Sequence, residues 1–400
     1  MNYKKIWSEV ITASLIIIIS AIAIISFIVI SDQDVDIYNP SNKIAVSKGT
    51  DKISEILNLL QSKYMGELDV DKLVDGAIEG IFANIDDPYT RYLSPEQFEE
   101  EMNAGNEEYS GVGIHISLDA KTREAKIIGV MPETPAKEAG VKAGDIIVKV
   151  DDLVVTEKTY YEASDAIKGE EGTIVKLVVR RNGEELTYNI ERAKIKASDI
   201  SSTIINNDIG YIKIFTFERN VYNNFKAEYN RLIREDEITG LIIDLRDNPG
   251  GFVDETVKIA DLLCGSGTII KEEYGDGTTK MFTSGESKSE IPIVVLVNEN
   301  SASAAEILAG AIKDLDAGTL VGSTTFGKGI MQSYIELENG GGVAITIAKY
   351  YTASGEEIHG IGITPDIEIE LSEGDVLDFS GNPKKDSQLN QAIKEIEKMQ

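Results

Sequence analysis

A serine lies where a predicted buried strand gives way to a predicted helix. The segment Asn300-Ser301-Ala302-Ser303-Ala304-Ala305-Glu306 follows the apolar run Ile293–Val297. The N-terminus of a helix favours a nearby developing anion, so this is a suitable place for a serine nucleophile. Ser303 also has capping-box spacing to Glu306, and a serine so placed is usually a helix cap. The segment alone leaves both interpretations open.

A nucleophilic serine needs a base, and the composition narrows the choice. The chain holds two histidines, His115 and His359, and one cysteine. Such scarcity argues against most zinc enzymes and nearly excludes a Ser-His-Asp triad. Lys328 lies in a glycine-flanked turn and can serve as the base if burial lowers its pKa toward neutrality. Gln332 could hold the lysine amine in place. The alternative is that Lys328 is an ordinary loop lysine.

The same turn raises a rival interpretation as a nucleotide site. Residues 322–329 nearly match the phosphate-binding loop G-x-x-x-x-G-K-[ST], but Gly329 stands where the Mg²⁺-binding hydroxyl should be. The residues that follow have a strand pattern, whereas a phosphate loop leads into a helix. Nucleotide binding through residues 322–328 is therefore a disfavoured alternative.

Two glycine-rich turns could present backbone amides to a ligand. Asn248-Pro249-Gly250-Gly251 connects a predicted strand to a predicted helix, and Gly251 together with the Ala304 amide could stabilise an oxyanion. Gly111-Val112-Gly113-Ile114 precedes a strand, where such a turn can hold a peptide carboxylate while the peptide adds as a strand. A plain tight turn is the alternative for both.

Periodicity divides the chain into several parts. Helical spacing is followed by a compact mixture of short strands and helices, and then by strands that alternate with crossover helices. We expect a multidomain α+β protein with an α/β core, an inserted smaller domain and an N-terminal helical region. The expected boundaries are 1–9 for a cytoplasmic N-terminus, 10–30 for a transmembrane helix, 31–48 for a linker, 49–107 for the helical region, 108–193 for the inserted domain, 194–372 for the core and 373–400 for a tail with an amphipathic helix.

Residues 10–30 form a run of 21 residues without a charge, which is long enough to span a bilayer. Lys4 and Lys5 precede the run and acidic residues follow it, so the positive-inside rule places the N-terminus in the cytoplasm and the remaining chain outside. We expect an uncleaved anchor, with a cleaved signal peptide as the alternative. The formal net charge of −29 argues against a nucleic-acid partner.

The ordered set of motifs resembles the C-terminal processing peptidases, or tail-specific proteases, over roughly residues 51–400. The motifs are Asp87-Pro88-Tyr89-Thr90, Gly111-Val112-Gly113-Ile114, Asp244-Leu245-Arg246-Asp247-Asn248-Pro249-Gly250-Gly251, Ser301-Ala302-Ser303-Ala304-Ala305-Glu306, Phe326-Gly327-Lys328-Gly329 with Gln332, and Gly362-Ile363-Thr364-Pro365-Asp366. The resemblance implies that Ser303 is the nucleophile, Lys328 the general base and Gln332 the residue that positions it.

The resemblance also implies that residues 108–193 form a PDZ domain, with Gly111, Val112, Gly113 and Ile114 as the carboxylate-binding loop. We therefore expect a bacterial, membrane-anchored serine endopeptidase that needs no cofactor and cleaves extracytoplasmic proteins after capturing their C-terminal tails. A homodimer through the N-terminal and C-terminal helices is a further expectation. The alternatives are a non-catalytic PDZ-type binding module, a structural scaffold, and the disfavoured nucleotide-binding protein.

Overall fold

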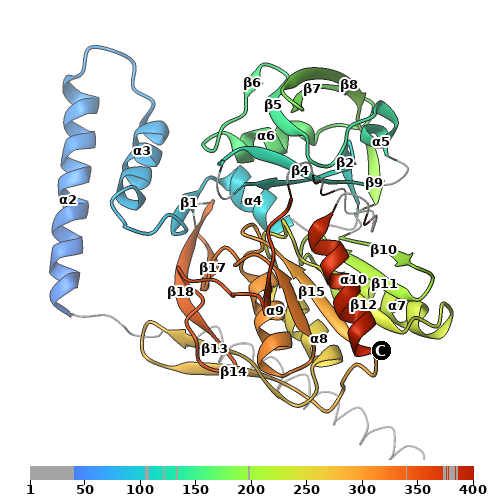
Figure 1. The fold of residues 1–400 in the computed structure, drawn as a ribbon. Coiled ribbons are helices and arrows are strands. Elements are labelled where there is room, and N and C mark those ends of the chain that lie inside the picture. Colours follow the sequence, from blue (N-terminus) through green and yellow to red (C-terminus); the bar gives the residue numbers. More distant parts are fainter. Residues whose placement is uncertain are drawn as a thin grey trace, which may run out of the picture. The chain divides into compact units, whose positions relative to one another are not determined.

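The computed structural model describes residues 40–103, 108–119, 122–131, 134–196, 199–338, 340–372, 375, 377, 383 and 386–400. The chain divides into two compact units, and the boundary lies between Ala77 and Ile78 (Figure 1). The predicted anchor at residues 10–30 lies outside the described residues. Among the helices that are described, none combines the length and the apolar character needed to cross a bilayer.

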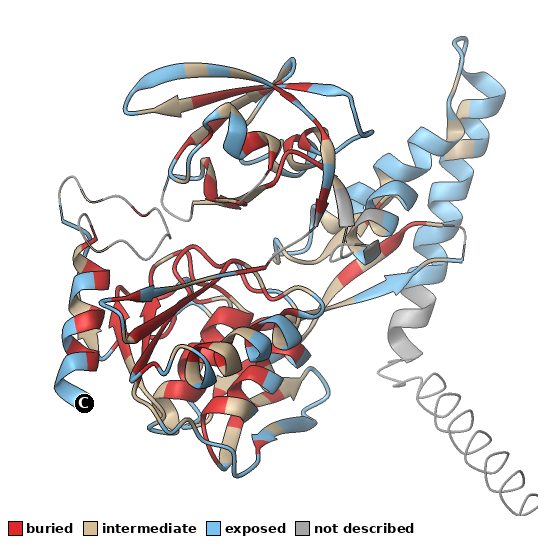
Figure 2. Cartoon of the chain, turned by 90° about the vertical axis from the view of Figure 1, so that its right-hand side faces the viewer, coloured by how far each residue is buried: buried red, intermediate tan, exposed pale blue. Residues whose placement is uncertain are grey.

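The N-terminal region is helical, as expected. It contains α2 (Pro40–Lys63) and α3 (Val70–Phe82). The linker predicted through residue 48 is too long, because α2 already begins at Pro40. Proline is favoured in the first turn of a helix, where its missing N–H has no partner to lose. The apolar face of α2 is exposed: Ile56 and Leu59 retain 49% and 51% of their accessible surface (Figure 2).

The inserted domain is an antiparallel sheet with two short helices packed against it. Its strands run in the order β3-β4-β5-β7-β8, with β6 beside β5, and a separate pair, β2-β9, joins its two ends. The elements are β2 (Glu108–Gly111), β3 (Ile114–Leu118), β4 (Ala125–Val130), α5 (Pro135–Ala139), β5 (Ile146–Val150), β6 (Leu153–Val154), α6 (Tyr160–Ile167), β7 (Ile174–Arg181), β8 (Glu184–Glu191) and β9 (Ala193–Lys196).

The core contains a mainly parallel sheet in the order β10-β11-β12-β15-β16-β19, in which β10 alone is antiparallel to its neighbour. Helices α7, α8 and α9 cover one face and α10 covers the other (Figure 1). The elements are β10 (Ile200–Ile205), β11 (Ile209–Ile214), α7 (Val221–Arg234), β12 (Gly240–Asp244), α8 (Val253–Leu263), β15 (Ile293–Val297), α9 (Ala304–Asp314), β16 (Thr319–Gly322), β19 (Ile367–Glu368) and α10 (Ser387–Met399). Since both faces are covered, the central strands read as continuous apolar runs.

A second, antiparallel sheet in the core has the order β1-β18-β13-β14, and β17 also pairs with β18. Its strands are β1 (Arg91–Leu93), β13 (Gly267–Tyr274), β14 (Thr279–Ser284), β17 (Ile330–Glu336) and β18 (Gly342–Thr352), and α4 (Pro95–Asn103) follows β1. Strands β17 and β18 form an antiparallel hairpin. Because β1 pairs with β18, a segment near residue 90 reaches the strands that follow Lys328.

A buried guanidinium fixes the C-terminal helix to the core. The Arg246 side chain is fully buried and pairs with Asp244 (2.5 Å) and with Asp386 at the start of α10 (2.8 Å). The apolar side of α10, which includes Leu389 and Ile396, packs on the sheet. That face is therefore not free for the dimer contact expected of the C-terminal helix.

Candidate active site

Ser303 is the N-cap of α9, directly after the loop that leaves β15. Its backbone has φ 54° and ψ −116°. A serine seldom adopts a positive φ, and such strain concentrates at functional sites. The sequence predicted a serine at a strand-to-helix turn. The strained backbone favours the interpretation as a nucleophile over that of a simple cap.

One carboxylate connects the serine and the lysine. Oε2 of Glu306 accepts the backbone N–H of Ser303 (2.9 Å) and that of Lys328 (2.8 Å). Oε1 accepts the N–H of Gly327 (2.7 Å) and the hydroxyl of Thr325 (2.6 Å). Glu306 is fully buried, one turn into α9. The nucleophile loop and the lysine turn are thus held on a single buried group.

The hydrogen bonds favour the ionised form of this carboxylate. A carboxylate has about four lone-pair positions, and each is taken by a donor. The Thr325 hydroxyl accepts the N–H of Ile363 (2.6 Å) and is left with one proton to donate to Glu306. Burial raises the pKa of Glu306, and the four hydrogen bonds oppose that rise. Loss of the carboxylate would leave backbone donors unpaired inside the protein.

Lys328 is partly buried, and the pKa of its amine is lowered. The main cause is burial, which disfavours the charged form, and the Arg91 guanidinium lowers the pKa further. The amine lies over the ring of Tyr89, with Nζ 4.7 Å from the ring centroid. A lowered pKa is what a lysine needs in order to accept a proton near neutral pH.

Gln332 lies on β17, four residues after Lys328 in the sequence. Its side-chain Nε2 donates to Thr346 Oγ1 on β18 (3.4 Å). The backbone N–H of Thr346 donates to Thr90 Oγ1 (3.0 Å). The predicted positioning residue is therefore connected to the turn that carries Tyr89. Sequence spacing gave no sign of this connection.

The glycine turn after β12 lies against the serine. A Cβ added at Gly250 would come within 2.7 Å of Ser303 Cβ and 3.0 Å of the Ala304 nitrogen. The Gly250 N–H donates to Asn248 Oδ1 (2.8 Å), so this amide is already engaged. Gly251, with φ 138°, and Ala304 remain the candidates for oxyanion donors at this junction.

Asp247 joins the nucleophile loop to the inserted domain. Its Oδ1 accepts the side-chain amides of Asn298 (2.8 Å) and Asn300 (2.7 Å), both in the nucleophile loop. Its Oδ2 pairs with Lys126 on β4 (2.8 Å). Burial opposes ionisation, yet Lys126 and the amides keep the pKa of Asp247 below its ordinary value. These residues were missed, because contacts between distant segments leave no local pattern.

The inserted domain has a small groove beside the predicted carboxylate loop. The lining residues come from the loop and β3 on one side and from α6 on the other: Val112, Gly113, Ile114, Ile116, Ser164, Ile167 and Lys168. Its volume is about 70 Å³. Gly111 pairs with Ala193 between β2 and β9, so the loop begins where the domain joins the core. The groove is mostly apolar, with one lysine among its lining residues.

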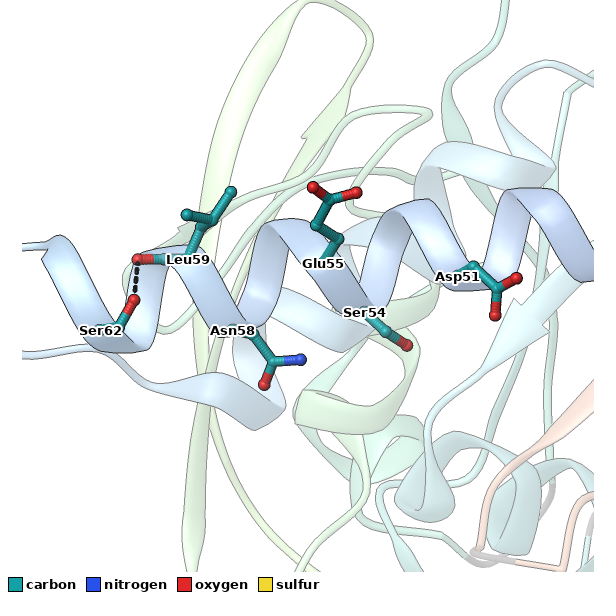
Figure 3. A pocket seen from close by; sticks show the side chains of 6 residues that line it. All are labelled: Asp51, Ser54, Glu55, Asn58, Leu59 and Ser62. Carbon is teal, nitrogen blue, oxygen red and sulfur yellow. Dashed lines mark hydrogen bonds between the residues drawn. The ribbon is translucent and has the colours of Figure 1, made fainter.

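Another hollow lies along α2, in the N-terminal unit. Figure 3 shows its six lining side chains, all of which come from that one helix: Asp51, Ser54, Glu55, Asn58, Leu59 and Ser62. The Ser62 hydroxyl donates to the Leu59 carbonyl (3.1 Å), as exposed helical serines often do. This hollow contains no group paired for catalysis.

The geometry does not support the nucleotide alternative. A phosphate loop needs free backbone amides, but the amides of Gly327 and Lys328 both donate to Glu306. The next element is strand β17. An anion at this turn would compete with a buried carboxylate, which the protein already holds there.

Family models match three parts of the chain. Residues 208–369 match peptidase family S41, residues 126–181 a PDZ domain, and residues 27–97 the N-terminal domain of the activating protease CtpB. The carboxyl-terminal-processing protease of Synechocystis sp. is 37% identical over 301 residues, which cover 74% of this chain and 70% of that protein. The chain belongs to the S41 carboxyl-terminal processing proteases. It is a serine-type peptidase with a PDZ domain.

Further relatives agree with this assignment. The carboxy-terminal processing protease CtpA of Bacillus subtilis is 37% identical over 327 residues, which cover 80% of this chain and 69% of that protein. The solved structure of the photosystem II D1 C-terminal processing protease matches with a TM-score of 0.61 and 31% identity, over 78% of this chain and 86% of that one. An S41 protease from Bacteroides fragilis, at 17% identity and a TM-score of 0.53, shows the same fold.

Proposed function

We propose that this peptidase cleaves peptide bonds with Ser303 as nucleophile and Lys328 as general base. Ser303 Oγ attacks the substrate carbonyl carbon while its proton passes to the neutral amine of Lys328. The amides of Gly251 and Ala304 stabilise the oxyanion, and the lysine then protonates the leaving amine. Water enters, loses a proton to Lys328 and attacks the acyl carbon; the bond to Ser303 Oγ breaks, and Lys328 returns the proton to that oxygen.

The shared carboxylate of Glu306 is the observation that carries this assignment. It receives the backbone N–H groups of both Ser303 and Lys328, so it fixes the nucleophile and the base relative to each other. Gln332 contributes through its contact with Thr346, whose backbone N–H donates to Thr90 in the turn that carries Tyr89.

The test uses a peptide substrate, three variants of the dyad, one control variant and His359→Ala. Ser303→Ala and Lys328→Ala should each abolish turnover while the melting temperature stays near that of the wild type. Lys328→Arg should be equally inactive, because a guanidinium does not give up its proton near neutral pH. Lys313→Ala, at a lysine of α9 that pairs with Asp366, is the matched control and should retain activity. Activity in Lys328→Arg together with loss in His359→Ala would contradict the dyad.

We infer that the PDZ groove captures the C-terminal tail of the substrate. The backbone of residues 111–114 receives the terminal carboxylate, and the apolar groove between β3 and α6 receives the last side chain. Amidation of the tail should therefore weaken binding. Substitution at Gly113 is an unsuitable test, because a Cβ there would come within 2.5 Å of Thr134 at a φ of 82°. An amidated peptide that binds as tightly as the free acid would remove this role.

We also propose that the protease is held in the cell membrane by residues 10–30, with the catalytic part outside the cytoplasm. The uncharged run, preceded by Lys4 and Lys5, supports this orientation. N-terminal sequencing of the mature membrane protein should find residues before Val10. A mature start near Ser31 would instead identify a cleaved signal peptide.

A homodimer through the N-terminal helices is a further proposal. Apolar side chains of α2 are exposed, whereas the apolar face of α10 is already packed against the sheet. Helix α2 is therefore the better candidate for the contact. Replacing Ile56 and Leu59 with Glu should convert a dimer to a monomer in sedimentation experiments. A wild-type chain that sediments as a monomer would exclude the pairing.

A further inference from the structure

An aromatic ring from a distant part of the chain covers the amine of the proposed base. Tyr89 belongs to the turn between α3 and β1, and Lys328 Nζ lies 4.7 Å from its ring centroid. This separation is inside the range of about 6 Å over which an ammonium is attracted to a ring face. The contact therefore involves the one atom of Lys328 that has to exchange a proton.

The turn that carries the ring is firmly held. Asp87 Oδ1 accepts the N–H of Tyr89 (2.9 Å), and Oδ2 accepts the hydroxyl of Thr90 (2.7 Å). The Thr90 hydroxyl oxygen receives the N–H of Thr346 (3.0 Å), and Thr346 Oγ1 receives the side-chain amide of Gln332 (3.4 Å). The same short network thus braces the aromatic ring and the residue proposed to hold the base.

We propose that Tyr89 is a positioning residue for the proposed general base: its ring face holds the Lys328 ammonium and shields the amine from water. The inference rests on the proposed role of Lys328. The ring has two opposing effects on the ammonium form of Lys328. Its π face stabilises the ammonium, and the cover it provides against water destabilises it. After Lys328 takes the proton of Ser303, the ring keeps the new ammonium close until the leaving amine receives that proton.

The charged groups that face the lysine amine come from four other elements. Arg91 of β1 disfavours the ammonium, whereas Glu101 of α4, Glu306 of α9 and Asp87 of the turn favour it. All four remain when Tyr89 alone is replaced. The difference between variants at position 89 therefore reports the ring itself.

Three replacements separate the two actions of the ring. Tyr89→Leu keeps an apolar cover but removes the π face, so the acid limb of the pH profile of kcat/KM should move to lower pH by about 0.4–1.5 units. Tyr89→Ala removes the cover and admits water, so the same limb should move to higher pH. Tyr89→Phe keeps a ring face, and its limb should stay close to that of the wild type.

The position of the limb does not depend on how much of each preparation is folded, so a partly unstable variant still gives a reading. If Tyr89→Ala does not fold, the comparison of Leu with Phe decides. The proposal is supported if the acid limb moves in opposite directions in Tyr89→Leu and Tyr89→Ala. It is also supported if the limb moves to lower pH in Tyr89→Leu alone and stays in place in Tyr89→Phe. The proposal is overturned if the acid limb lies at the same pH in all variants, or if it moves in the same direction in Tyr89→Leu and Tyr89→Ala. Lys328→Ala is measured alongside: turnover in that variant would reject the dyad itself, which is a separate result.

Discussion

Replacement of Glu306 by glutamine tests how the site is assembled. The four partners of the carboxylate are all donors: the amides of Ser303, Gly327 and Lys328 and the hydroxyl of Thr325. Glutamine has nearly the same shape, but it brings one oxygen and one NH₂ group. In either orientation of the side chain, two donors then face the NH₂ group and lose their acceptor.

The cost follows from burial. A buried donor left unpaired costs about 1–3 kcal/mol, so two of them cost about 2–6 kcal/mol. The Thr325 hydroxyl can rotate, so the lower part of this range is expected if it is one of the two. The penalty falls on Ser303 and Lys328 in one orientation and on Gly327 and Thr325 of the lysine turn in the other, so in both it should loosen the connection between the nucleophile loop and the lysine turn. Misplacement by about 1 Å reduces turnover roughly 100-fold.

The assay combines chemical denaturation with peptide turnover and labelling of Ser303 by a fluorophosphonate. Glu255→Gln is the matched control. Glu255 is a buried glutamate of α8 that accepts Tyr222 N–H (3.0 Å) and Lys258 Nζ (2.6 Å), and these two partners lie on α7 and α8, outside the nucleophile loop and the lysine turn. Both variants should lose stability, but Glu306→Gln alone should lose labelling and turnover. If Glu306→Gln keeps turnover within about twofold of the control, the argument from shared hydrogen bonds is refuted.

Three other predictions address the base, the core and the groove. Below the pKa of Lys328, kcat/KM should rise tenfold per pH unit, because the neutral amine is the active form. The midpoint of this rise should lie below 10.5, and adding a chelator should not change the profile. Asp386→Asn should cost about 3–5 kcal/mol in denaturant unfolding, because it removes a partner of the buried Arg246, while Asp375→Asn should cost about 1 kcal/mol or less. Ile167→Asp should weaken binding of a tail peptide in calorimetry by about tenfold or more, while Glu162→Ala, on the same helix, should not; equal affinities would place the tail elsewhere.

Local patterns predicted most of the elements well. Strand β15 lies on the predicted apolar run, β17 begins where a strand pattern was expected after Gly329, and α10 is the amphipathic helix expected in the C-terminal tail. These elements carry continuous or periodic apolar residues over their whole length, so periodicity is a strong signal there. Strands β13 and β14 were not predicted. Their burial alternates irregularly, and β14 is largely exposed, so they lack a clear period.

The candidate residues Ser303 and Lys328 stand out in the sequence because of their surroundings: a strand-to-helix turn in one case and flanking glycines in the other. Glu306 was seen as a possible capping partner, but its contact with the lysine turn was not predicted. Residue spacing reveals a contact between residues three apart in one helix. It does not reveal a contact between that helix and a turn that is distant in the sequence. Tyr89 belonged to a recognised motif whose physical role became visible through the ring contact with Lys328.

The catalytic site therefore depends on parts of the chain outside the α/β core. Tyr89 comes from the turn before β1, Lys126 from the PDZ domain, and Asp386 holds Arg246, which follows β12 by two residues. Each of these contacts involves a charged group that is wholly or partly buried, and such a group is costly to bury without its partner. The candidate active site is thus held by contacts with the turn before β1, the PDZ domain and the C-terminal helix.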